Sequence, residues 1–237
     1  MTVSRMRWRT AACAAGVGLA LVFVSPGFAR ADDDFARLLQ LSPDTTAQEL
    51  EDSARAYAQS AGITYAEALA LARAGAEANL IESSGGSCDT PEKIIGNAEL
   101  RGDVFYSSST HGIDHGHVGL YSQIDQITEA PGVGKRSGTF SATGRTYCTG
   151  IEKMHVDTSS AYRGKAADFA ETKLVGKSYG GFLFNKDDSL DDLNCSELVW
   201  KAYMFGPEVD LDAGEPTAVY PLDIKNSKLT DTYKTIT

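Results

Sequence analysis

The sequence has little positive charge. Its 237 residues include 22 lysines and arginines against 32 aspartates and glutamates, a formal net charge of −10. Four of the basic residues and none of the acidic ones stand within residues 1–31, so the remaining chain carries a net charge of −14. A surface of this charge repels phosphate backbones and anionic lipids. Nucleic-acid binding and binding to acidic membranes are therefore not expected.

Long hydrophobic runs are also scarce, and the one present lies at the N-terminus. Three arginines within residues 5–9 precede the apolar stretch 10–24, and a small-x-small pattern ends at Ala31. This order is typical of a secretory signal peptide over residues 1–31. The apolar stretch is short for a membrane span, which makes an uncleaved anchor the weaker alternative. We expect a secreted, extracellular protein with no membrane span in its mature form.

Cysteine is scarce as well. Three cysteines follow the predicted signal peptide: Cys88, Cys148 and Cys195. In an oxidising compartment an odd number leaves one thiol without a partner in its own chain. Cys88 and Cys148 lie in loop-like segments rich in Gly, Ser and Thr, so we expect these two to form a disulfide. Cys195 is then free.

Residues 32–84 are predicted to form a helical N-terminal segment. Thr46 with Glu49 and Thr64 with Glu67 fit the capping-box pattern, in which a Thr caps the helix and a Glu follows three residues later. Gly62 between them is a plausible helix C-cap. The segment contains no histidine or cysteine, so it receives no chemistry. Its role stays open between a pro-segment, a cover on the substrate side and a docking element.

Residues 85–237 show a different pattern, which predicts one α+β domain. Apolar residues alternate or run over strand lengths between Gly, Ser and Asp, and helical spacing follows later in the chain. The expected strands lie within 102–108, 115–123, 124–132 and 150–157, and the expected helices within 162–176 and 195–206. The pattern predicts a small antiparallel sheet packed on helices. The acidic loop 185–192 is expected to be solvated rather than to bind calcium.

Cys195 is the first candidate for chemistry. Asn194 is a good helix N-cap, which places Cys195 at the first position of the helix. A thiol there faces unpaired backbone N–H groups and the positive end of the helix dipole, both of which favour the reactive thiolate. A buried structural thiol explains the same stretch equally well.

A nucleophilic cysteine needs a base, and His117 is the best placed histidine. It begins an apolar strand, which can hold the imidazole in one orientation. If 117–123 and 126–130 form a hairpin turning near Ile124 and Asp125, Glu129 is a close cross-strand neighbour of His117. Glu129 would then orient the imidazole. Taken alone, Glu129 is better explained as a solvated acid at a strand end.

A zinc site is the alternative use of the histidines. His111, Asp114, His115 and His117 offer nitrogen and oxygen ligands within seven residues. Their spacing differs from the helical H-E-x-x-H pattern, and this interpretation leaves Cys195 without a role. The remaining histidine, His155, lies in another strand with no evident partner, so it is assigned to core or surface.

The motifs together resemble a known family. "GDVFY", "HGHVGLYSQ" and "ITEAPGVG", followed by "GKSYGGFLFNKDD" and "NCSELVWKAY", resemble the YiiX-like branch of the NlpC/P60 superfamily over about residues 98–225. These are papain-like hydrolases with a circularly permuted order, in which the His and acidic strands precede the nucleophile helix. The helical segment 32–84 lies outside the resemblance.

The resemblance implies a role for four residues. Cys195 is the nucleophile, His117 its base and Glu129 the polar third member. Tyr179, in the Gly-flanked stretch before the cysteine, contributes to the oxyanion site, although it could instead only pack under the loop. Asn194 stands at the position before the cysteine where relatives often carry another residue. This difference is expected to affect the capping of the helix more than the chemistry of Cys195.

The expected function is a secreted cysteine hydrolase, an amidase or peptidase that forms a covalent acyl-enzyme without cofactor or metal. Its expected partner is a peptide, amide or acyl substrate, and export favours one derived from peptidoglycan. The alternatives are a noncatalytic binding module on the same fold, a thiol acyltransferase or lipid-amide hydrolase, and a zinc hydrolase. The sequence does not determine the oligomeric state.

Overall fold

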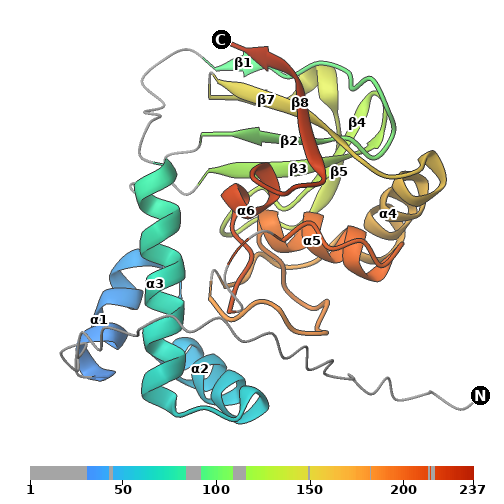
Figure 1. Ribbon diagram of the computed structural model, residues 1–237. Coiled ribbons are helices and arrows are strands. Elements are labelled where there is room, and N and C mark those ends of the chain that lie inside the picture. The colour runs from blue at the N-terminus through green and yellow to red at the C-terminus, as the bar shows by residue number, and fades with distance from the viewer. Residues whose placement is uncertain are drawn as a thin grey trace, which may run out of the picture.

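The computed structural model describes residues 31–42, 45–83, 92–108, 116–148, 150–181, 183–212, 214 and 217–237. The predicted signal peptide, apart from Ala31, lies outside these residues. In the described part of the chain, no helix is long and apolar enough to cross a membrane. Three helices come first, and an antiparallel sheet with further helices follows (Figure 1). The predicted α+β class is confirmed.

The N-terminal helices are α1 (Ala31–Leu41), α2 (Ala47–Ala61) and α3 (Tyr65–Ser83). Both predicted capping boxes are present. The backbone N–H of Thr46 donates to Glu49, that of Thr64 donates to Glu67, and each Thr hydroxyl accepts in return. Gly62 ends α2 with φ +69°, a left-handed conformation that favours glycine. These boundaries are set locally, as the sequence predicts.

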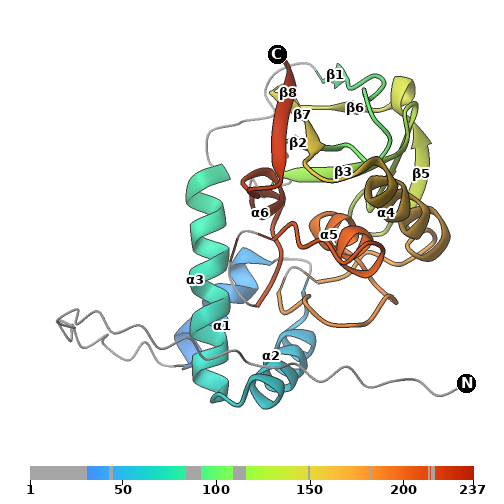
Figure 2. The same ribbon diagram turned by 45° about the vertical axis from the view of Figure 1, so that its right-hand side comes forward.

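The helical segment shares a hydrophobic core with the rest of the chain. Apolar side chains of α1, α2 and α3 pack together and also against Leu183, Phe184, Ala218 and Tyr220. The ring centroid of Tyr57 lies 5.4 Å from that of Phe184. In both views α3 stands beside α6, and α1 and α2 pack along α3 (Figures 1 and 2). The helical segment is therefore packed against the loops on either side of α5.

The main sheet has six strands in the order β5-β4-β3-β2-β7-β8, and every neighbouring pair is antiparallel. The strands are β2 (Val104–Ser107), β3 (His117–Gln123), β4 (Gln126–Glu129), β5 (Gly138–Ser141), β7 (Ile151–Val156) and β8 (Thr230–Ile236). A two-stranded sheet pairs β1 (Lys93–Ile94) with β6 (Thr146–Tyr147), and the 3-10 turn η1 (Ala142–Gly144) precedes β6.

The two faces of the sheet bury different layers. Val104, Val118 and Met154 belong to the core that includes α4 (Ser160–Lys173), α5 (Cys195–Phe205) and α6 (Pro221–Lys225). Phe105 and Tyr121, on the alternate positions, belong to the core under residues 95–98 and β6. Successive side chains of a strand point to opposite faces of the sheet, so neighbouring residues of one strand enter different cores. Figure 1 shows α4 and α5 on one side of the sheet.

The sequence pattern missed several elements of the sheet. It gave no strand for β1, β5, β6 or β8, and it placed no helix at α6. β8 is an edge strand of sequence TDTYKTI, with intermediate or exposed side chains along its length. Polar edge strands are common because they resist pairing with other chains, but they carry little hydrophobic signal.

Candidate active site

Cys195 lies at the start of α5. Asn194 is the N-cap: its Oδ1 accepts the Glu197 backbone N–H at 2.9 Å, and Glu197 completes a capping box. The backbone N–H groups of Cys195 and Ser196 precede the one that the cap binds, and no earlier turn of the helix offers them an acceptor. The Cys195 thiol is free and only 2 % exposed. The predicted helix start and free thiol are thus confirmed.

The helix behind Cys195 is fixed on all sides. Every residue from Cys195 to Tyr203 is buried, so α5 is enclosed all round rather than amphipathic. The Ser196 hydroxyl donates to the Val219 carbonyl at 2.7 Å, and the Tyr203 hydroxyl donates to the Gly102 carbonyl. The thiol therefore sits on a rigid support.

His117 opens β3 and is held between aromatic rings. Its ring stacks on Tyr147 with centroids 5.5 Å apart and lies 5.9 Å from Phe105. The preceding Gly116 has φ +69°, and a Cβ there would come within 2.6 Å of the Tyr106 ring. Only glycine satisfies both conditions, so the entry into β3 is fixed at this point.

Glu129 binds His117 as the hairpin predicted. His117 Nε2 lies 2.6 Å from Glu129 Oε2, at the end of the β3–β4 hairpin opposite its turn. Because Nε2 faces Glu129, Nδ1 is the nitrogen left for Cys195, whose side chain also hydrogen bonds to the imidazole. Glu129 is completely buried rather than solvated at a strand end. Cys195, His117 and Glu129 are in contact, in that order.

Arg145 and Tyr147 also bind Glu129, and the sequence pattern did not single them out. The Tyr147 hydroxyl donates to Glu129 Oε2 at 2.8 Å, and the Arg145 guanidinium pairs with Oε1. Arg145 in turn lies over the Phe140 ring, 4.5 Å from its centroid. Both residues lie 16 or more positions from Glu129, so no local spacing revealed them. Their position before Cys148 was the one available signal.

The charges of the site stabilise one another. Burial lowers the pKa of His117, but the hydrogen bonds to Cys195 and Glu129 outweigh this effect and raise the pKa to about 10. Burial likewise raises the pKa of Glu129, yet contacts with His117, Arg145 and Tyr147 bring that pKa below its usual value. The arrangement therefore favours an imidazolium paired with a carboxylate.

Tyr179 lies close to Cys195 in the structure. It is half-buried and packs against the core cluster that contains Cys195. The Leu193 backbone N–H donates to the Ser178 carbonyl at 2.9 Å, which places Tyr179 beside the residues leading into α5. A role in the oxyanion site stays a prediction.

The cysteine pairing is consistent with the expectation for two of the three residues. Cys148 is disulfide-bonded and Cys195 is free. Cys88, the expected partner, lies outside the described residues. A disulfide at Cys148 tethers the segment that carries Arg145 and Tyr147.

The residues of the alternative zinc site lie largely outside the described part of the chain. His111, Asp114 and His115 are not described, and among the residues that are, no three His, Cys, Asp or Glu side chains form a group that could hold a metal ion. For His155, the expectation of no partner was wrong. Its Nδ1 lies 3.0 Å from Asp103 Oδ1, and its ring stacks on Tyr233. A separation of 52 residues hid the contact with Asp103.

Comparison with known proteins gives one strong similarity. No family model matches the chain. The uncharacterized protein YycO of Bacillus subtilis (strain 168) is 32% identical over 231 residues, which cover 91% of this chain and 92% of YycO. The crystal structure of the metalloprotein YiiX from Escherichia coli O157:H7 matches 57% of this chain and 97% of its own, at 18% identity and a TM-score of 0.43. On the identity and length shared with YycO, the chain belongs to the same protein family as YycO.

Proposed function

We propose that the protein is a secreted cysteine hydrolase that acts on an amide or peptide bond through a covalent acyl-enzyme. The observation that carries the proposal is the continuous contact from the Cys195 thiol through His117 to the buried Glu129. A nucleophile, a base and an orienting group in hydrogen-bond contact are the parts that covalent acyl transfer needs. A structural thiol would require neither the imidazole nor the carboxylate.

In the proposed reaction Cys195 is the nucleophile, and His117 acts first as an acid and then as a base. The Cys195 thiolate attacks the carbonyl carbon, and the electron pair of the C=O bond moves to the oxygen. When that bond re-forms, the C–N bond breaks and His117 gives its proton to the leaving amine. A water molecule then loses a proton to His117 and attacks the thioester, which releases the acid and restores the Cys195 thiolate beside a protonated His117.

The developing oxyanion needs donors in fixed positions. The Cys195 backbone N–H, at the start of α5, is one such donor, and the Tyr179 hydroxyl is proposed as the second. The packing of Tyr179 against the core around Cys195 supports this assignment. Glu129 keeps the imidazole oriented and stabilises its charged form, because its own carboxylate is held by Arg145 and Tyr147.

A circularly permuted papain-like fold of the NlpC/P60 type is part of the proposal. The order along the chain supports it: the antiparallel strands with His117 and Glu129 come first, and the helix that begins at Cys195 comes last. Export, inferred from residues 1–31, favours a cell-wall peptide or amide as the substrate and a location outside the cell or at its wall.

The first experiment tests the thiol. Iodoacetamide near neutral pH is expected to alkylate Cys195 in the protein with an intact His117, and His117→Ala is expected to slow the alkylation strongly. Mass spectrometry of the cysteine-containing peptides measures both rates. If Cys195 does not react, or if its alkylation rate is the same in the wild type and in His117→Ala, the proposed role of His117 as the base is contradicted.

The second experiment identifies the reaction. Purified protein and its Cys195→Ala variant are incubated with a panel of peptidoglycan-derived peptides and fatty-acyl amides, with and without an added amine or alcohol acceptor. Turnover that depends on Cys195 supports the hydrolase. Product formed only with an acceptor identifies an acyltransferase, and no turnover of either class leaves a binding module as the better explanation.

A further inference from the structure

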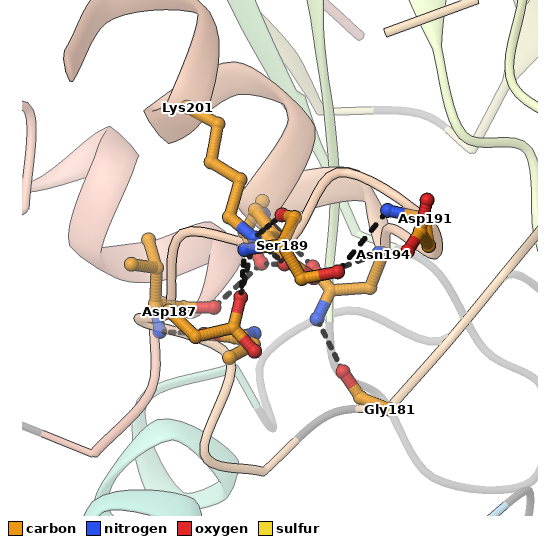
Figure 3. Close-up of polar contacts among 10 residues, drawn as sticks. Gly181, Asp187, Ser189, Asp191, Asn194 and Lys201 are labelled. Atoms are coloured by element: carbon orange, nitrogen blue, oxygen red, sulfur yellow. Dashed lines mark hydrogen bonds and ion pairs between the residues drawn. The ribbon is translucent and has the colours of Figure 1, made fainter. Parts of the chain in front are cut away.

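Lys201 is a buried cation on the same helix as Cys195. Its side chain is completely buried, which is rare for lysine unless it is paired. Its Nζ lies 2.9 Å from Asp187 Oδ1 and 2.5 Å from Glu197 Oε1, and it also donates to the Ser189 carbonyl. Figure 3 shows the ammonium directed into the loop that carries Asp187 and Ser189.

The loop is folded around this ammonium. The Ser189 backbone N–H donates to Asp187 Oδ1 at 3.0 Å, and the Asp191 backbone N–H donates to the Ser189 hydroxyl at 3.2 Å (Figure 3). The aspartates of the loop are exposed, as the sequence predicted, but the turn between Asp187 and Ser189 faces inward to Lys201. The positive charge that this acidic loop binds is therefore supplied by α5.

A chain of contacts leads from Lys201 to the residue before the cysteine. Glu197 uses one carboxylate oxygen for Lys201 and the other to accept the Asn194 backbone N–H at 3.3 Å. The Asn194 side chain accepts the Glu197 backbone N–H and donates to the Gly181 carbonyl at 2.8 Å (Figure 3). Gly181 lies two residues after Tyr179. The contacts thus reach both proposed oxyanion donors, the Cys195 N–H and the segment that carries Tyr179.

We propose that Lys201 is a positioning residue of the active site. Its ammonium ties the loop 187–191 to α5 and, through Glu197 and Asn194, fixes the peptide group that precedes the Cys195 thiol. This inference rests on the proposed function, in which Cys195 is the nucleophile. It adds to that function a residue that touches neither the substrate nor the reacting atoms.

A purely stabilising role would not require a charge here. Replacing a buried ion pair by apolar side chains of similar volume is often neutral or favourable for stability, whereas removing one partner leaves an unpaired buried charge. Burial already raises the pKa of Glu197 to about 8, although Lys201 and the Asn194 N–H act against this rise. An ammonium with three directed donors fixes a loop and a helix cap in one geometry, which an apolar side chain cannot do.

Three variants separate positioning from folding. Lys201→Met removes the ammonium and keeps the length of the side chain. Lys201→Met with Glu197→Gln also removes the carboxylate that would be left unpaired, and Gln at this position preserves the capping box. Lys153→Met is the matched control, because Lys153 is 2% exposed and donates to the Ile95 and Asn97 carbonyls at the other core of the sheet.

The readouts are the melting temperature, the rate of Cys195 alkylation by iodoacetamide, and kcat and KM once a substrate is known. Lys201→Met and Lys153→Met are both expected to lower the melting temperature. Only in the Lys201 variants is iodoacetamide expected to alkylate Cys195 more slowly. In the same variants kcat is expected to fall by roughly 10- to 100-fold, the loss that a displacement of about 1 Å produces, while KM changes little. The double variant is expected to regain stability but not the rate.

Two results would overturn the inference. In the first, Cys195 of the double variant is alkylated at the wild-type rate, which would mean that the ammonium matters only for stability. In the second, Lys153→Met slows alkylation as much as Lys201→Met, so that the effect follows global stability. If iodoacetamide alkylates Cys195 in the wild type but the protein turns over no substrate, the proposed hydrolase is refuted. The alkylation rates of the variants would still decide the role of Lys201.

Discussion

At the scale of single residues, Glu129 is the centre of the site. A carboxylate removed from water is tolerated only when its oxygens are paired, and both oxygens of Glu129 are. His117 and Tyr147 bind Oε2, and Arg145 binds Oε1. The three partners keep Glu129 ionised in spite of its burial.

Arg145→Met is expected to raise the pKa of Glu129, because the guanidinium charge is one of the contacts that lower it. Glu129 contributes stability when ionised, and this contribution is lost as the pH falls below the carboxyl's usual value of 4.5. In the variant the carboxyl of the folded protein takes up its proton at a higher pH, so its contribution to stability is smaller and the acid limb of the alkylation or kcat/KM profile shifts upward.

The matched control for Arg145→Met is Arg136→Met, which removes an exposed guanidinium that donates to the Gly176 carbonyl. Its pH profile is expected to coincide with that of the wild type. Coincidence of all three profiles would show that Arg145 does not act on Glu129.

His117 links the site to stability at alkaline pH. Its pKa is about 10 in the folded chain against 6.5 for the unperturbed group, so the folded state binds the proton more tightly. The resulting stabilisation is fully present below pH 6.5 and is lost as the pH rises towards 10. The wild-type melting temperature is therefore expected to fall more steeply over this range than that of His117→Asn. Parallel curves in thermal unfolding would contradict the raised pKa.

At the scale of elements, the N-terminus of α5 joins helix formation to chemistry. Asn194 caps the helix, binds Gly181 and directly precedes the thiol. The same capping box occurs at Thr46 on α2, where it only begins a helix. One local motif therefore has a purely structural use and a second use at the site.

Asn194→Ala and Thr46→Ala form a matched pair. Each loses an N-cap hydrogen bond, which costs about 1 kcal/mol of the free energy of unfolding. Asn194→Ala also loses the hydrogen bond to the Gly181 carbonyl, so its total cost is expected to be higher. Only Asn194→Ala is expected to change the alkylation rate of Cys195, because only that cap directly precedes the thiol. Urea unfolding and alkylation kinetics measure the two effects. An equal change in reactivity for both variants would be evidence against the special role of the α5 cap.

At the scale of the whole molecule, the N-terminal helices and the sheet domain share a hydrophobic core. Phe184 lies in that core beside Tyr57 and has φ +60°, an unfavourable conformation for an aromatic residue. The loop that carries Phe184 leads to Asp187 and onward to Cys195. The helical segment therefore supports the same loop that Lys201 binds from the other side.

Phe184→Ala is expected to cost about 3–5 kcal/mol, as for other buried Phe side chains replaced by Ala. It should also separate the helical segment from the sheet domain, so that the single calorimetric transition expected of the wild type becomes two. Phe169→Ala, which removes a ring packed on Phe205 between α4 and α5, should lower stability without splitting the transition. A wild type that already unfolds in two steps would refute the shared core.

Much of the site was predictable because its parts are local. The caps at Thr46, Thr64 and Asn194 are set by hydrogen bonds over three residues, and the approach of His117 to Glu129 by one tight hairpin. Cysteine counting correctly left Cys195 free. Arg145, Tyr147, Lys201 and the Asp103 partner of His155 were not predictable in this way, since their roles depend on contacts between distant elements.

The sequence by itself determined where α5 begins, which strand carries His117 and which residue that hairpin places beside it, because hydrogen bonds over a few residues and the period of a strand do not depend on the rest of the fold. Only the tertiary structure brought the thiol to the imidazole, since Cys195 belongs to the core on one face of the sheet and the rings around His117 to the core on the other. It also decided that Glu129 is buried and that Lys201 closes an acidic loop. Burial and charge pairing follow from the order of strands and the packing of layers, which no short stretch of sequence contains.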